Sequence, residues 1–136
     1  MKYLLDTDIC IYLIKQKPAE VLEKFRGIPL GEIGISSITV AELEYGVEKS
    51  RYPDKNRTAL ELFLAPLEIA LFDRAAARET GVIRAAFERS GTPIGAYDLQ
   101  IAGQARARDV VLVTNNTKEF DRVDGLEVEN WVDSPQ

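Results

Sequence analysis

The chain has 136 residues, of which 46% are hydrophobic and 29% are charged, and its formal net charge is −5. This composition is typical of a folded globular protein and argues against intrinsic disorder. Histidine is absent and Cys10 is the single cysteine, which excludes histidine bases, Ser-His-Asp triads, Cys-His pairs and the usual zinc sites.

The first half of the chain alternates between short apolar runs and longer stretches with apolar residues at helical spacing. This pattern predicts strands over residues 2–5 and 33–35 and helices over residues 7–15, 19–25, 37–49 and 55–64. Ser36 or Ser37 would cap the third helix. Residues 27–31 indicate a loop, and residues 52–54 (Tyr-Pro-Asp) indicate a turn before the fourth helix.

The second half continues this alternation. Strands are expected over residues 67–72, 110–114 and 126–129, and helices over residues 74–89 and after Pro93-Ile94-Gly95. The apolar run at 110–114 is typical of a strand in the middle of a parallel sheet. Together the elements indicate an α/β fold, with residues 1–136 forming a single three-layer α/β/α domain around a central, mostly parallel sheet.

The apolar run over residues 9–14 is too short to cross a bilayer, and Asp6 and Asp8 precede it. We therefore expect no membrane segment and a cytoplasmic location.

Three acidic motifs place carboxylates among residues that otherwise have core character. They are Leu4-Leu5-Asp6-Thr7-Asp8, Val40-Ala41-Glu42-Leu43 and the Asp98 motif at residues 96–102. A buried carboxylate must be paired, hydrogen-bonded or bound to a cation. Three of them, far apart in sequence, suggest one shared site for a hard divalent cation with oxygen ligands, either magnesium or manganese.

Asp6 and Asp98 each have a purely structural alternative. Asp6 directly follows the first strand, where α/β sheets bind ligands, but it or Asp8 could instead cap the following helix. Asp98 could be a first-turn acid favoured by the helix dipole. Its neighbours Ile101 and Ala102, three and four residues on, place it instead on the apolar face of that helix, where an acid needs a partner.

Glu42 could form a capping box with Thr39. The helix signals at Ser37 and Ile38 favour an earlier start, which would put Glu42 one turn inside the helix. Gly46 is costly inside a helix, and it would let another chain segment or a ligand come close.

A fourth polar segment, residues 113–120, follows the apolar strand. Thr114 offers a hydroxyl, and Asn116 and Glu119 offer further oxygens. Loops of this composition are common, so an ordinary polar loop remains open as an alternative.

The overall charge opposes nucleic-acid binding, but the basic residues are clustered. The two clusters are Lys49, Arg51, Lys55 and Arg57, and Arg84, Arg89, Arg106 and Arg108. They could contact a phosphate backbone beside an acidic pocket, although solvated helix faces are the simpler interpretation.

Taken together, these motifs resemble those of the PIN-domain ribonucleases of the VapC toxin type. The matching segments are residues 4–8, 36–46, 92–98, 113–120 and the closing Val128-Glu129-Asn130-Trp131. The resemblance covers essentially the whole chain and implies that Asp6, Glu42 and Asp98 are acidic metal-site residues. Asn116 occupies the last position of the family pattern, so either Asn116 or Glu119 completes the set.

The resemblance also implies a mechanism. Asp6 and Asp98 would bind Mg²⁺ (or Mn²⁺) directly, while Glu42 and Glu119 would hold a second ion or orient water, making all four acids catalytic. Thr7, Thr114 and Asn116 would be supporting polar residues. The implied activity is endonucleolytic cleavage of structured RNA, for which tRNA is one candidate.

The family further implies a homodimer and a hetero-oligomer with a VapB-type antitoxin. An arginine or lysine of the antitoxin would enter the acidic pocket, and arginine is favoured because its planar fork binds two carboxylate oxygens. The rest of the antitoxin segment would lie in an apolar groove near Ile11, Leu13 and Leu43.

Two alternatives from other functional classes remain. Asp6-Thr7-Asp8 after a strand resembles the D-x-D motif of haloacid-dehalogenase-type phosphatases, in which Asp6 would be the phosphorylated nucleophile. A non-catalytic binding module on the same fold is the other, and it predicts no RNA cleavage with Mg²⁺ or Mn²⁺.

Overall fold

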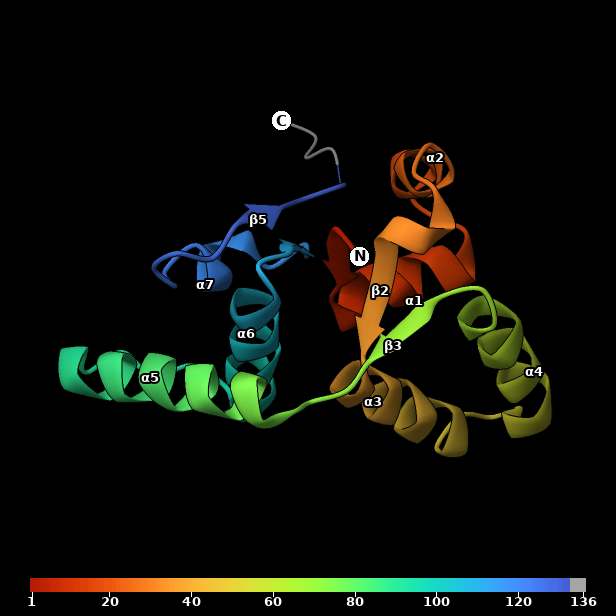
Figure 1. Cartoon of the computed structure of the whole chain (residues 1–136). Coiled ribbons are helices and arrows are strands. Elements are labelled where there is room, and N and C mark those ends of the chain that lie inside the picture. The colour runs from red at the N-terminus through yellow and green to blue at the C-terminus, as the bar shows by residue number, and fades with distance from the viewer. Residues whose placement is uncertain (133–136) are drawn as a thin grey trace.

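The computed structural model describes residues 1–132 and has a five-stranded sheet at its centre (Figure 1). The strand order is β3-β2-β1-β4-β5. The strands are β1 (Tyr3–Leu5), β2 (Ile33–Ser36), β3 (Glu68–Ala70), β4 (Val111–Val113) and β5 (Val128–Glu129). Every neighbouring pair is parallel, which confirms the α/β prediction.

Helices cover both faces of this sheet. They are α1 (Thr7–Lys15), α2 (Ala19–Arg26), the short 3₁₀ helix η1 (Leu30–Glu32), α3 (Ser37–Glu48), α4 (Pro53–Leu64), α5 (Arg74–Ser90), α6 (Ala96–Arg108) and α7 (Thr117–Phe120). Figure 1 shows α5 and α6 on one side of the strands and α1, α2 and α4 on the other. No helix within residues 1–132 is long and apolar enough to cross a membrane.

Two hydrophobic cores, one on each face of the sheet, produce the three-layer architecture. Leu4 and Leu112 belong to the core under α5 and α6, whereas Leu5 and Val113 belong to the core under α1 and α4. Successive strand residues point to opposite faces, so a short, fully apolar strand supplies both cores.

Several element boundaries differ from the sequence-based expectation, and strands β4 and β5 are shorter than expected. Helix α4 begins at Pro53 rather than at residue 55, because proline suits the first helical position, where no hydrogen-bonded N–H is needed. Strand β3 is shorter than the expected residues 67–72. Residues 117–120 form the short helix α7 within a segment that could have been only a polar loop.

Helix α6, which carries Asp98, is fixed by two close contacts. A Cβ atom at Gly103 would collide with the Thr80 hydroxyl and lie 2.8 Å from the Thr80 backbone nitrogen, so glycine lets α5 and α6 approach closely. The buried Gln104 amide donates hydrogen bonds to the carbonyls of Ala70 (2.8 Å) and Leu71 (2.9 Å). Asp98 therefore projects from a helix anchored to both α5 and the end of β3.

Candidate active site

The carboxyl ends of β1, β2 and β4 meet at one edge of the sheet. Leu5 pairs with Ile35 on one side and with Val113 on the other. Asp6 follows β1 and Thr114 follows β4, while β2 ends at Ser36 and continues into α3. Ligands of open α/β sheets bind in the crevice outside such strand ends. Most of the sequence-predicted site residues come from these connections.

Asp6 is both the N-cap residue of α1 and part of a buried hydrogen-bond chain. Its side chain is 8% exposed. Its Oδ1 accepts a hydrogen bond from the Thr7 N–H (2.8 Å), and its Oδ2 accepts one from the Thr114 hydroxyl (2.8 Å). The Thr114 oxygen in turn accepts from the Asn116 N–H (2.9 Å). Burial raises the pKa of Asp6 and the charge of Glu42 adds to this, while the bonds from Thr114 and Thr7 oppose it.

Glu42 lies one turn inside α3 and is not part of a capping box. The helix begins at Ser37, and Ser36 Oγ caps it by accepting from the Ile38 N–H (3.0 Å). This earlier start leaves the Glu42 carboxylate free for another partner. Glu42 Oε1 accepts a hydrogen bond from the Thr7 hydroxyl (2.8 Å), which joins α3 to α1 beside Asp6.

Asp98, in the first turn of α6, is the third of the predicted acids. Its pKa is raised to about 6, first by burial and then by the negative charges of Asp6, Glu119 and Glu42. The charges of four acids from separate elements thus act on one region. Among residues 1–132, no basic side chain forms an ion pair with Asp6, Glu42 or Asp98.

Asp8 belongs to the same cluster, although the sequence reasoning offered it only as a helix cap. Its carboxylate accepts hydrogen bonds from the N–H groups of Ile9 (2.7 Å) and Asn115 (3.0 Å). Burial and the charge of Asp6 raise the pKa of Asp8 to about 6. Asp8 therefore fastens the segment after β4 to the start of α1. The D-x-D spacing at Asp6-Thr7-Asp8 is the sequence signal for this role.

Glu119 and Asn116 contribute to the cluster in different ways. The Glu119 carboxylate pairs with Arg122 (3.2 Å), and its charge also raises the pKa of Asp98. Asn116 is exposed at the N-cap position of α7, where its side chain makes no capping hydrogen bond. Its backbone N–H, rather than its side chain, joins the hydrogen-bond chain to Asp6. Of these two residues, Glu119 is the one whose charge acts on Asp98.

The donor chemistry of the cluster fits a hard divalent cation. Within residues 1–132, no group of three or more acidic, histidine or cysteine side chains could hold a metal ion as it stands. The available donors are nevertheless all oxygens, and their mutual repulsion is not relieved by an ion pair at Asp6, Glu42 or Asp98. Oxygen donors with excess negative charge favour Mg²⁺ or Mn²⁺ over Zn²⁺.

Half of the clustered basic residues are neutralised by acids of the same chain. Arg57 binds Glu44 (2.6 Å) and Glu48 (2.5 Å). The other pairs are Arg84–Glu88 (3.1 Å), Arg106–Glu79 (2.7 Å) and Arg108–Glu68 (3.6 Å). Lys49, Arg51 and Lys55 have no ion pair within the described part of the chain.

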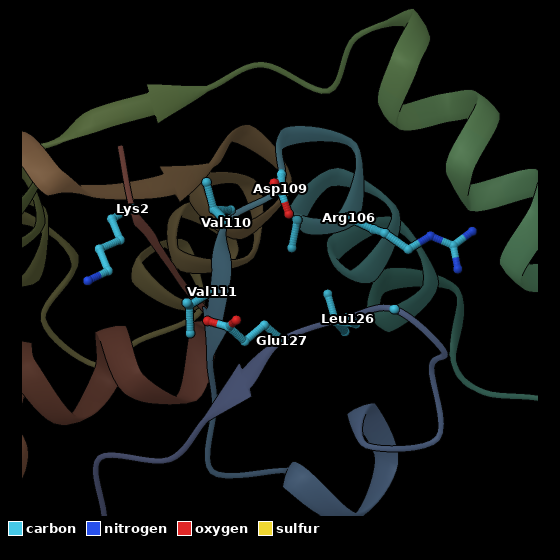
Figure 2. Close-up of a pocket in the computed structure, with 9 residues that line it drawn as sticks. Lys2, Arg106, Asp109, Val110, Val111, Leu126 and Glu127 are labelled. Atoms are coloured by element: carbon cyan, nitrogen blue, oxygen red, sulfur yellow. The ribbon is translucent and has the colours of Figure 1, made fainter.

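A separate hollow of about 220 Å³ lies at the opposite edge of the sheet (Figure 2). It is bordered by Lys2, by Val110 and Val111 at the start of β4, and by Glu127 just before β5. The Arg106 guanidinium on its border is bound to Glu79 and to the Asp124 carbonyl. This hollow is therefore separate from the acidic cluster.

Comparison with known proteins gives a consistent result. The PIN domain family model matches residues 3–126. A tRNA(fMet)-specific endonuclease VapC from Shigella flexneri is 49% identical, over 96% of this chain and 98% of the relative. Ribonuclease VapC2 from Haemophilus influenzae is 46% identical, over 97% and 99%. A chain in the crystal structure of DNA-bound VapBC from Salmonella typhimurium aligns with TM-score 0.92 and 46% identity, over 97% and 99%.

Removing one charge from the cluster should stabilise the metal-free protein. Asp98→Asn keeps the size of the side chain but removes the charge whose burial, and whose repulsion by the other acids, raise the pKa of Asp98 to about 6. Below the unfolded pKa the Asp98 carboxyl is protonated in both states, and its protonation favours the fold. This contribution is lost as the pH rises through about 6, so the variant should lose less stability between pH 5 and 8.

In EDTA at pH 7.5 we expect a gain of up to about 1 kcal/mol in unfolding free energy, reduced by solvent screening because Asp98 is only half buried. Denaturant titration at pH 7.5, repeated at pH 5, measures this gain. Asp124→Asn, an exposed acid without a side-chain partner among residues 1–132, is the control. An equal gain in the control, or a loss of stability in Asp98→Asn, would contradict the claim that the Asp98 charge destabilises the metal-free protein.

Proposed function

Because the chain belongs to the PIN domain family and, within it, to the VapC ribonucleases, we propose that it is an endoribonuclease toxin that cleaves RNA at the acidic cluster. The resemblance drawn from the sequence motifs is thereby confirmed at the level of the family. The observation that carries the proposal is the convergence of acids at the carboxyl ends of the parallel strands, where Thr7 binds both Asp6 and Glu42 and the charge of Asp98 acts on the same region. The name of the Shigella relative supports structured RNA, and tRNA in particular, as the substrate.

The proposed cofactor is Mg²⁺, with Mn²⁺ as a substitute. Asp6 and Asp98 would hold the ion directly, and Glu42 and Glu119 would hold a second ion or orient water. The cation would supply the charge that lowers the pKa of an attacking water and offsets the charge of the scissile phosphate. Glu119 is favoured over Asn116 for the fourth position, because its charge acts on Asp98.

The neighbouring polar groups hold these acids in place. Thr114 and the Thr7 N–H each bind one oxygen of Asp6, and the Thr7 hydroxyl binds Glu42. These bonds fix the orientation of two carboxylates before substrate arrives, so the site needs little reorganisation for reaction. Thr7 and Thr114 would therefore act through the carboxylates as positioning residues.

The phosphatase alternative is not favoured, since the matching family and relatives are PIN-domain ribonucleases. The other alternative is a binding module that does not cleave RNA. Under that alternative, the purified chain would cleave no RNA with either Mg²⁺ or Mn²⁺.

RNA cleavage by the purified chain tests the proposal. Asp6→Asn and Asp98→Asn should each lower the cleavage rate at least about 100-fold, because asparagine cannot supply the charge that holds the cation. EDTA should stop cleavage, Mg²⁺ or Mn²⁺ should restore it, and Zn²⁺ should restore it poorly. Asp124→Asn should cleave at the wild-type rate. Full activity in EDTA, or in either cluster variant, would refute the mechanism.

We further propose a VapB-type antitoxin as the partner, together with a homodimer and a toxin–antitoxin hetero-oligomer. The Salmonella neighbour was solved as a VapBC complex. An apolar groove of about 250 Å³ between α1, α3 and α4 offers a docking site, lined among others by Ile11, Ile14 and Leu43. Of the three residues expected near this groove, Ile11 and Leu43 line it, whereas Leu13 packs into the core and Ile14 lines the groove beside it.

The partner is tested by co-expression with the neighbouring small open reading frame. The chain alone should arrest growth, and co-expression should restore it and yield a complex with the small protein in a pull-down. An arginine of that protein changed to alanine should weaken inhibition, if it enters among Asp6, Glu42 and Asp98. A chain that is harmless alone and captures no small partner would refute the toxin assignment even if it cleaves RNA.

A further inference from the structure

A hollow of about 580 Å³ adjoins the acidic cluster. Its lining includes Glu42 of the cluster and the residue bound to it, Thr7, together with Tyr45, Lys49 and Tyr97. The hydrogen bond between Thr7 and Glu42 (2.8 Å) forms part of its wall. A ligand in this hollow would therefore contact the proposed cleavage site directly.

Two tyrosines that line this hollow are largely exposed. Tyr45 on α3 is 65% exposed, and Tyr97 on α6 is 60% exposed. Tyr45 lies three residues after Glu42, on the same face of the helix, and Tyr97 immediately precedes Asp98. Neither ring packs against another aromatic ring within residues 1–132. One exposed tyrosine is ordinary, but two around one hollow beside carboxylates form a candidate stacking surface.

Unpaired positive charge lies at the same place. The Lys49 ammonium is 4.9 Å from the centre of the Tyr45 ring, and Lys49 also lines the hollow. Arg51 and Lys55 follow it in the chain, and none of the three has an ion pair among the described residues. Arg57, by contrast, is bound by two glutamates. Of these three, Lys49 is the one that lines the hollow, and in a chain of net charge −5 its free ammonium is suited to a phosphate.

We propose that Tyr45 and Tyr97 hold an unpaired base of the RNA next to the scissile phosphate, with Lys49 at a neighbouring phosphate. This rests on the proposed ribonuclease function and adds to it the residues that would bind the RNA beside the cleavage site. Any of the four bases can stack on an aromatic side chain, but the base must first be unstacked from the RNA duplex. Bases of an intact A-form duplex are stacked and cannot enter, so the hollow selects loops, bulges or single strands.

Space for such a base is left by Gly46, which also lines the hollow. A Cβ atom built at Gly46 meets no atom within 4 Å, so a larger side chain there would enter open space. Replacement of a helical glycine by leucine also favours the helix, so Gly46→Leu should fold while filling the hollow.

RNA binding separates this role from catalysis. We would measure fluorescence anisotropy in the Asp98→Asn background, where cleavage is stopped, with two RNA probes: a hairpin with an unpaired loop and a blunt duplex of the same stem. Tyr45→Ala, Tyr97→Ala and Gly46→Leu should each weaken hairpin binding about 5- to 100-fold and leave duplex binding unchanged. Tyr45→Phe and Tyr97→Phe should bind as the parent does, since the ring face is kept.

Tyr52→Ala is the matched control. Tyr52 is 59% exposed and has Arg51 5.6 Å from its ring centre, but it does not line the hollow. It should bind both probes unchanged. Thermal melting of each variant checks that the fold is intact.

The inference is overturned if the alanine variants bind the hairpin as the parent does, if hairpin and duplex binding fall equally, or if phenylalanine is as harmful as alanine. Loss of antitoxin binding with unchanged hairpin binding would assign the hollow to the antitoxin and overturn it too. If wild-type protein cleaves RNA but the tyrosine variants cleave equally well, only this inference fails. If wild-type protein neither binds nor cleaves RNA, the proposed function fails and this inference with it.

Discussion

The position of β1 between β2 and β4 is the constraint on which the rest of the site depends. Because all three strands are parallel, their carboxyl ends lie at one edge of the sheet. The chain leaves β1 at Asp6, β2 at Ser36 and β4 at Thr114, so these connections converge on one crevice. Asp98 reaches the same crevice from α6, whose place is set by the close contact of Gly103 with Thr80.

Bringing carboxylates together in this crevice costs stability, and the protein offsets the cost only in part. Hydrogen bonds from Thr7 and Thr114 favour the charged form of Asp6, while burial and repulsion raise the pKa values of Asp8 and Asp98 to about 6. Acids with perturbed pKa values in a crevice are typical of functional sites. Such sites keep the charge that a ligand needs, although this charge lowers the stability of the ligand-free protein. The remaining negative charge is what a divalent cation would neutralise.

Much of this arrangement could be predicted from sequence, because strand and helix periodicity are local signals. Asp6, Glu42 and Asp98 were predicted because each carboxylate interrupts an apolar pattern. The role of Asp8 was missed, since its bond to the Asn115 N–H joins segments more than a hundred residues apart. Likewise, periodicity could not reveal that Arg57 is neutralised while Lys49 is not, because ion pairing between helices depends on tertiary packing.

Cation binding tests the central claim most directly, because it needs neither a substrate nor an antitoxin. Isothermal titration with Mn²⁺ should show binding to the wild-type chain and to Asp124→Asn, and binding should be lost or weakened at least about tenfold in Asp6→Asn and in Asp98→Asn. Equal binding by the wild type and both cluster variants, or no binding by the wild type, would contradict the claim that these carboxylates are held together for a metal ion.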